Sequence, residues 1–157
     1  MKTLILYASK YGATKEIAQR ISQKIGNAVV CDLKNDSIPP LADFDCIIIG
    51  SSVYAGSIRK EAKAFAAQNA AGLGEKICGL FLSGFAEDNG YFTTNFSQNL
   101  LDRIRAKGFL GGIFDPKKAG AIERFIIKIV MKQSGYVEKI DDDAIGRFVD
   151  TMKGKGA

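Results

Sequence analysis

The sequence contains no histidine and no tryptophan, and only three prolines and three cysteines among its 157 residues. Without histidine, the chain cannot build Ser-His or Cys-His catalytic pairs, a histidine general base or a zinc site with histidine ligands. The cysteines, Cys31, Cys46 and Cys78, are far apart and lie in or beside apolar runs, without C-x-x-C spacing. We therefore expect small buried thiols in a reducing compartment, and neither a metal nor an iron–sulfur site.

Long hydrophobic runs are also missing. No apolar stretch approaches the ~18 residues of a membrane-spanning helix, and the apolar start of the chain is too short for a signal peptide. We expect a cytoplasmic protein, with a peripheral position at the inner face of the membrane as the alternative. The net charge of +5 favours acidic partners, but the basic residues are dispersed and form no nucleic-acid motif, so we expect no nucleic-acid partner.

What the sequence does contain is typical of one globular domain. Of its residues, 46% are hydrophobic and 25% are charged, and a chain of this length normally builds a single core. We therefore expect residues 1–157 to form one domain.

Apolar runs alternate with segments of helical spacing. The predicted strands are residues 3–8, 28–32, 44–50, 77–82 and 109–114. The predicted helices are residues 17–25, 59–71, 96–107, 122–132 and 141–153. This alternation indicates right-handed βαβ units and an α/β fold with a doubly wound, five-stranded parallel sheet in the order 2-1-3-4-5 and helices on both faces. Asp141, Asp142 and Asp143 are interpreted as carboxylates at a helix start, where they complement the dipole, and not as a metal site.

Ligands bind such sheets beyond the carboxyl ends of the strands, where we expect the loops after strands one, three and four to meet. The first loop, S-K-Y-G-A-T, opens a helix and offers hydroxyl groups and a glycine, which suits a phosphate. It lacks both G-x-x-x-x-G-K-S/T and G-x-G-x-x-G, which argues against an NTPase and a dinucleotide site. A plain strand-to-helix turn is the alternative.

The second loop, residues 51–58, places Tyr54 at the end of the central strand, where it could stack on a planar ligand or simply cover the sheet edge. The third loop begins with S-G-F and offers a second aromatic wall, or aromatic anchors for the loop itself. The candidate cofactor-binding residues of the three loops are Ser9, Lys10, Tyr11, Gly12, Ala13 and Thr14; Ser51, Ser52, Val53, Tyr54, Ala55 and Gly56; and Ser83, Gly84, Phe85 and Tyr91.

These three loops together resemble the FMN-binding flavodoxin superfamily over essentially the whole chain. The resemblance implies a flavodoxin-like fold with FMN as cofactor, its phosphate on residues 9–14, its isoalloxazine beside residues 51–56 and its pyrimidine side near residues 83–91. Within the superfamily, G-S-S-V-Y-A-G-S-I-R-K and E-R-F-I-I-K-I-V-M-K-Q-S-G are similar to the subgroup that contains menaquinone-dependent protoporphyrinogen dehydrogenase. The implied partners are a redox protein or a quinone.

We therefore expect a flavodoxin-like redox protein that transfers electrons through FMN. One alternative is a quinone-dependent protoporphyrinogen IX dehydrogenase of haem biosynthesis, and a second is a non-redox, phosphate-binding regulatory domain. Two departures bear on this choice: Tyr11 stands where flavodoxins usually have threonine, and Glu87 and Asp88 stand where the dehydrogenase has a longer basic insertion. The predicted helix 122–132 carries a basic stripe, which favours an anionic membrane surface as a further partner; an ordinary core helix is the alternative.

Overall fold

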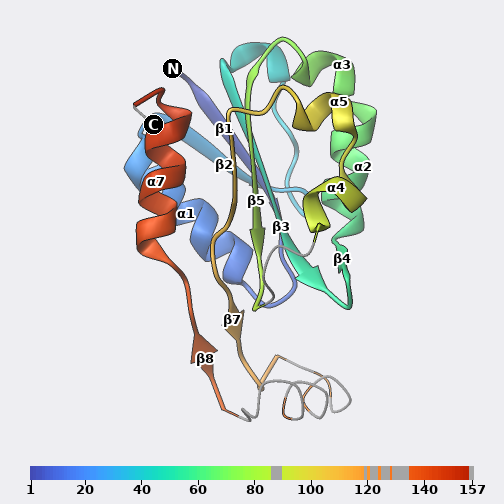
Figure 1. The fold of residues 1–157 in the computed structure, drawn as a ribbon, viewed down its shortest axis with the longest axis vertical. Coiled ribbons are helices and arrows are strands. Elements are labelled where there is room, and N and C mark those ends of the chain that lie inside the picture. The colour runs from blue at the N-terminus through green and yellow to red at the C-terminus, as the bar shows by residue number, and fades with distance from the viewer. Residues whose placement is uncertain (86–89, 119, 121–123, 125–127, 129–134, 156–157) are drawn as a thin grey trace.

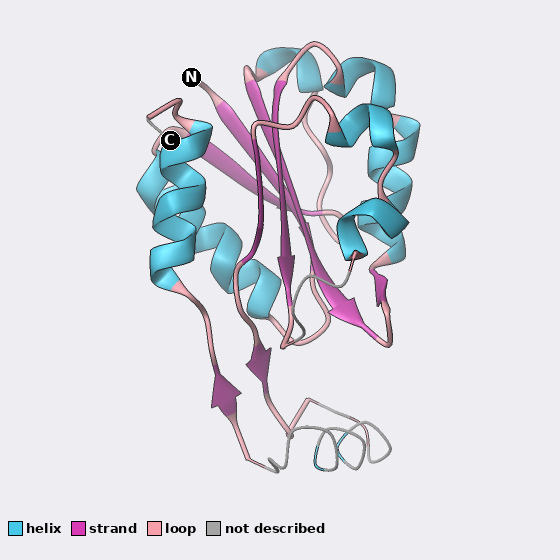
Figure 2. Ribbon diagram, viewed as in Figure 1, coloured by secondary structure: helices cyan, strands magenta, loops and turns pink. Residues whose placement is uncertain are grey.

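The computed structural model describes residues 1–85, 90–118, 120, 124, 128 and 135–155. Within these residues, a parallel sheet lies between two layers of helices, and a two-stranded arm extends from one end of the sheet (Figure 1). Figure 2 shows the same arrangement by element type.

The sheet confirms the predicted strand order. Its elements are β1 (Thr3–Ala8), β2 (Ala28–Asp32), β3 (Cys46–Tyr54), β4 (Ser57–Ile58), β5 (Ile77–Ser83) and β6 (Ala106–Phe109). The parallel order is β2-β1-β3-β5-β6, so β5 and β6 are the fourth and fifth parallel strands, and β4 forms an antiparallel hairpin with β3. Uninterrupted apolar runs form the central strands because both faces of a parallel sheet are covered by helices.

The helices divide between the two faces. They are α1 (Ala13–Ile25), α2 (Lys60–Gln68), α3 (Ala70–Leu73), α4 (Tyr91–Asn95), α5 (Gln98–Leu101) and α7 (Asp142–Met152), with a short 3-10 turn η1 (Leu41–Asp43). Figure 1 places α1 and α7 on one face and α2 to α5 on the other. Each layer buries its own apolar cluster, because alternate residues of a strand point to opposite faces.

Two predictions about the chain after β5 are wrong. Residues 96–107 form no long helix: α5 lasts one turn, and β6 begins at Ala106. The fifth strand is therefore Ala106–Phe109 and not residues 109–114. The physical reason is that Leu100 packs in the cluster under α2 to α5, whereas Ala106 packs in the cluster under α1 and α7. A continuous helix on one face of the sheet could not bury both.

The arm begins where β6 ends. Gly111 has φ +91°, and a Cβ there would overlap the carbonyl oxygen of Lys139, so the chain can turn away from the sheet only with a glycine at this position. Two short antiparallel strands, β7 (Ile113–Phe114) and β8 (Val137–Glu138), then form the described part of the arm. The predicted amphipathic helix 122–132 lies largely outside the described residues; Arg124 and Lys128, which are described, are exposed.

The base of the arm is fixed to the sheet and to α1. The Gly84 N–H donates to the Gly111 carbonyl at 2.9 Å, which joins the end of β5 to the start of the arm. Arg20 of α1 forms ion pairs with Glu138 of β8 at 2.9 Å and with Asp142 of α7 at 3.0 Å. None of the helices in the described part of the chain has the length and hydropathy that crossing a lipid bilayer requires.

Candidate functional site

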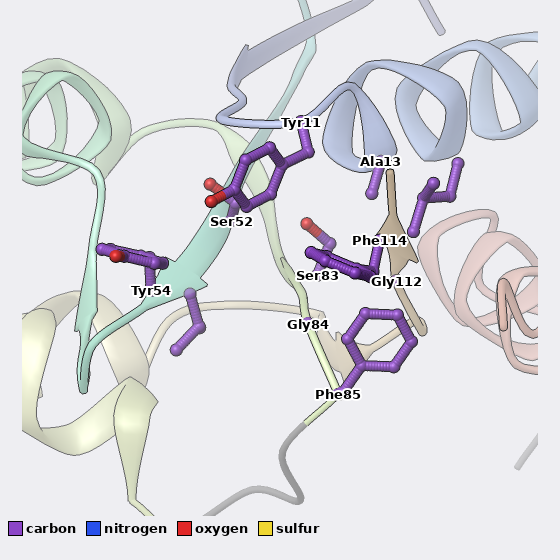
Figure 3. Close-up of a pocket in the computed structure, with 11 residues that line it drawn as sticks. Tyr11, Ala13, Ser52, Tyr54, Ser83, Gly84, Phe85, Gly112 and Phe114 are labelled. Atoms are coloured by element: carbon purple, nitrogen blue, oxygen red, sulfur yellow. The ribbon is translucent and has the colours of Figure 1, made fainter. Parts of the chain in front are cut away.

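A pocket lies at the carboxyl ends of β1, β3 and β5, the edge of the sheet where the sequence predicts a ligand site. Its lining comes from the first loop, the end of β3, the end of β5 and the arm (Figure 3). The lining residues are Tyr11, Ala13, Ser52, Val53, Tyr54, Ser83, Gly84, Phe85, Gly112, Ile113 and Phe114. The enclosed space is about 90 Å³, so a larger planar ligand would insert one edge and lie against the walls with the rest.

The first loop is held in shape by Ser9 and Gly12. The Ser9 hydroxyl oxygen accepts a hydrogen bond from the Gly12 N–H at 2.9 Å, and Gly12 takes φ +96° immediately before α1 begins. Because the first backbone N–H groups of a helix have no carbonyl partner within the helix, this loop presents donors and a positive dipole end. Such a loop suits an anion that bears several acceptor oxygens.

Thr14 and Ser83 link the first loop to the end of β5. Their hydroxyl oxygens lie 2.7 Å apart, and both residues are buried. A hydrogen bond between two hydroxyls uses only one of their two hydrogens. The other hydroxyl hydrogen can therefore be donated to an anion or to a polar ligand edge in the pocket.

The second predicted loop is partly strand. Residues 51–54 complete β3, and only Ala55 and Gly56 form the turn to β4, with φ values of +50° and +79°. Ser51 is engaged in this hairpin, because its hydroxyl donates to the Ser52 carbonyl at 3.0 Å and accepts from the Arg59 N–H at 2.9 Å. Its side chain does not line the pocket.

Ser52 differs from its neighbour. Its side chain lines the pocket and is only 8% exposed, yet its hydroxyl oxygen has no hydrogen-bond partner among the described residues. A buried hydroxyl without a partner costs roughly 1–3 kcal/mol, which a polar atom of a bound ligand would recover. Ser52 is therefore the position where the pocket itself indicates a polar ligand edge.

Aromatic side chains form the walls. In Figure 3, Tyr54 lies on one side, Phe85 and Phe114 lie on the other, and Ser83 lies between them. Tyr11 meets Phe114 edge to face, with ring centroids 6.5 Å apart. The Lys10 ammonium lies 3.1 Å from the Tyr54 ring centroid and 5.5 Å from that of Tyr11. The site therefore combines flat apolar surfaces with a positive charge.

The remaining predicted residues occupy different roles. Tyr91 begins α4 and packs on Phe109, with ring centroids 6.2 Å apart, against the apolar cluster under α2 to α5. The pocket is also lined by Gly112, Ile113 and Phe114, which the sequence predicted to lie in a strand of the sheet. The adjacent Gly111 and Gly112 are the sequence signal that could have indicated a break there.

The three cysteines do not line the pocket. Burial raises the pKa of Cys46 and of Cys78 to about 11, so both are protonated at neutral pH, and all three cysteines are free and buried. Among the described residues, no cluster of acidic or cysteine side chains could hold a metal ion. Among the described residues that line the pocket there is no carboxylate; their side chains are hydroxyl, aromatic and aliphatic groups.

Comparison with known proteins agrees with this geometry. The family described as "Flavodoxin domain" matches residues 4–141. The chain is 24% identical over 148 residues to protoporphyrinogen IX dehydrogenase [quinone] of Escherichia coli, covering 86% of this chain and 81% of the relative. Oxidised Flavodoxin 2 of Bacillus cereus superposes with a TM-score of 0.65 at 23% identity, covering 99% of this chain and 100% of that one. A Lactobacillus acidophilus flavoprotein in complex with FMN superposes with a TM-score of 0.52 at 20% identity, covering 71% and 92%. The chain therefore belongs to the Flavodoxin domain family.

Proposed function

We propose that this protein binds FMN in the pocket and transfers electrons through it. The observation that carries the proposal is Ser52, a buried hydroxyl without a partner that lines a pocket walled by aromatic rings. The same pocket adjoins a helix start suited to a phosphate, and a relative of the same fold is known in complex with FMN. FMN has both parts, a phosphate at one end and a planar ring with polar edges at the other.

Different groups of described residues would bind the two ends of the cofactor. The loop from Ser9 to Thr14 would hold the phosphate through backbone N–H groups and hydroxyls. The rings of Tyr54 and Phe85 would cover the flat faces and exclude water, and Ser52 would bond a polar edge. When bound, FMN supplies one- and two-electron chemistry, so the protein needs no acid or base of its own.

A visible spectrum of the purified protein tests this proposal. Flavin absorbance that remains after gel filtration, or saturable quenching of FMN fluorescence by the apoprotein, is the expected result. FAD is the matched control ligand: we expect FMN to bind more tightly, because its phosphate ends at the first loop. Failure of the folded apoprotein to bind FMN would overturn the proposal and would favour a non-redox role.

A second candidate is the quinone-dependent oxidation of protoporphyrinogen IX, favoured by the similarity to the Escherichia coli dehydrogenase. Anaerobic mixing of the FMN-loaded protein with protoporphyrinogen and a quinone tests it. We expect quinone-dependent formation of fluorescent protoporphyrin if the chain is such a dehydrogenase. FMN that is reduced by a redox protein but not by protoporphyrinogen would leave the electron-carrier function.

We further propose that the chain forms a single domain, because the sheet and the arm both contribute residues to one pocket. We also propose that the protein is cytoplasmic and docks at an anionic membrane surface. Exposed basic residues between β7 and β8, among them Arg124 and Lys128, support docking. Each is worth about 1 kcal/mol near an anionic leaflet, so co-sedimentation should occur with anionic but not with neutral vesicles at low salt. Exchange of Arg124 and Lys128 for glutamate should abolish it, and equal binding to both vesicle types would contradict it.

A further inference from the structure

Lys118, which follows β7, lies close to the first loop. A Cβ placed on Gly12 would lie 3.6 Å from Lys118 Nζ, so this ammonium stands at the turn that opens α1. Lys118 follows β7, whereas Gly12 precedes α1, and the two positions are far apart in the sequence. The fold therefore brings a second lysine to a loop that already carries Lys10, and places its ammonium at the helix start, whereas Lys10 lies over Tyr54.

A tight turn sets the position of Lys118. The carbonyl of Asp115 accepts from the Lys118 N–H at 3.0 Å, and an Asp115 carboxylate oxygen accepts from the Lys117 N–H at 2.9 Å. The turn directly follows Phe114, which is 1% exposed and packs on Tyr11 of the first loop. Thus Lys118 lies only four residues beyond a buried anchor that already touches the loop.

Gly12 leaves the space that this approach uses. With φ +96°, it adopts a backbone conformation that residues with a side chain rarely take, and among the described residues Lys118 Nζ is the one heavy atom outside its two chain neighbours that lies within 4 Å of a Cβ placed there. The Lys118 ammonium therefore stands beside the turn that opens α1, in the loop that also carries the Ser9 hydroxyl. Backbone N–H donors together with a flexible lysine ammonium match a phosphate dianion better than neutral donors alone.

We infer that Lys118 binds the phosphate of the cofactor at the start of α1. This inference rests on the proposed function, since the phosphate is that of FMN. A second observation points to a ligand in the pocket that adjoins this loop at Tyr11 and Ala13: the Ser52 hydroxyl, more than nine-tenths buried, lines that pocket without a partner among the described residues. Ser52 would bond the ring end and Lys118 the phosphate end of one molecule.

The inference predicts that Lys118 distinguishes FMN from riboflavin, which has the same ring system but no phosphate. Apoprotein of the wild type, of Lys118→Gln and of Lys117→Gln would be titrated with both flavins by fluorescence quenching. Lys117→Gln is the matched control, because this neighbour carries the same charge in the same turn and is also exposed. Lys118→Arg retains the charge and should retain most of the affinity.

We expect Lys118→Gln to weaken FMN binding about tenfold or more, because charge-assisted hydrogen bonds are the strong ones, and to leave riboflavin binding within about twofold of the wild type. Lys117→Gln should bind both flavins as the wild type does. An unchanged FMN affinity in Lys118→Gln, or equal losses for FMN and riboflavin, would overturn the inference while leaving FMN binding itself established.

If the wild type does not bind FMN, the proposed function fails, and a titration with inorganic phosphate decides the remaining point. Amide NMR signals of Gly12 and Ala13 should then shift with phosphate in the wild type and in Lys117→Gln, and much less in Lys118→Gln. Equal shifts in all three proteins, or none in any, would show that Lys118 does not serve a phosphate at this loop.

Discussion

The hydrogen bond between Thr14 and Ser83 joins the phosphate loop to the sheet, and its removal should destabilise the apoprotein. Thr14→Val keeps the shape of the side chain but deletes the hydroxyl that lies 2.7 Å from the Ser83 oxygen. A hydrogen bond of this kind contributes about 0.5–1.5 kcal/mol net, and the Ser83 hydroxyl, in a residue that is 1% exposed, would be left without its protein partner. Because removing one partner of a buried pair leaves the other unsatisfied, which costs roughly 1–3 kcal/mol, we expect a loss of about 1–3 kcal/mol.

A double-mutant cycle in urea, followed by circular dichroism without FMN, measures this coupling. Ser83→Ala should destabilise by a similar amount, and the double variant should lose less than the sum of the two, by about 1 kcal/mol or more, because neither partner is then orphaned. Thr151→Val is the control, since its exposed hydroxyl donates to a backbone carbonyl in α7 and should matter by less than about 0.5 kcal/mol. Strict additivity, or single losses no larger than the control, would refute the coupling.

The same variants separate a structural from a binding role for Thr14. If its hydroxyl, or that of Ser83 through it, donates to the phosphate, Thr14→Val should weaken FMN binding about tenfold or more while Thr14→Ser retains it. Affinity that is unchanged in a destabilised Thr14→Val would limit Thr14 to joining the loop to β5.

Three further outcomes are expected. Ala55→Gly should stabilise the protein by about 1 kcal/mol in thermal unfolding, because Ala55 has φ +50° in the turn between β3 and β4; no gain would mean that the turn carries little strain. The free energy of unfolding should fall as the pH rises from about 8.5 toward 11, because the thiols of Cys46 and Cys78 have a raised pKa of about 11 in the folded state and deprotonate first in the unfolded chain. Below that pH range, the two thiols contribute a constant amount to the free energy of unfolding. A variant with both Cys46→Ala and Cys78→Ala should show a shallower decline. Lys10→Met should lower the midpoint potential of bound FMN in dye-coupled titrations, because the reduced cofactor carries more negative charge and this ammonium stands over Tyr54, whereas Lys24→Met at the far end of α1 should not.

The elements that the sequence predicted best are those whose burial is uniform along the segment. Residues 3–8 and 77–82 are apolar throughout because both faces of the central strands are covered, and α7 begins, as interpreted, with an aspartate cap, Asp141, whose side chain accepts from the Ala144 N–H at 2.8 Å. The region after β5 was predicted poorly, because its burial changes sides within a few residues. Leu100 and Ala106 serve opposite clusters, and no local periodicity can represent a segment that crosses the edge of a sheet.

Prediction of the site residues also succeeded or failed with how local the burial of each residue is. Ser51 and Ser52 are identical in type and adjacent, yet alternation along β3 turns one into the hairpin and the other into the pocket, a distinction that requires the strand to extend to Tyr54. The arm was less accessible still, because Phe114 and Lys118 reach the first loop only through a turn at Gly111, which breaks the strand that the apolar run suggested. A sequence pattern indicates how a segment is buried against its neighbours in the sequence. Phe114 and Lys118 instead lie beside a loop that is far away in the sequence. A phosphate bound there would contact the first loop and Lys118, which are far apart in the sequence, so FMN affinity should depend on an arm residue that no loop motif includes.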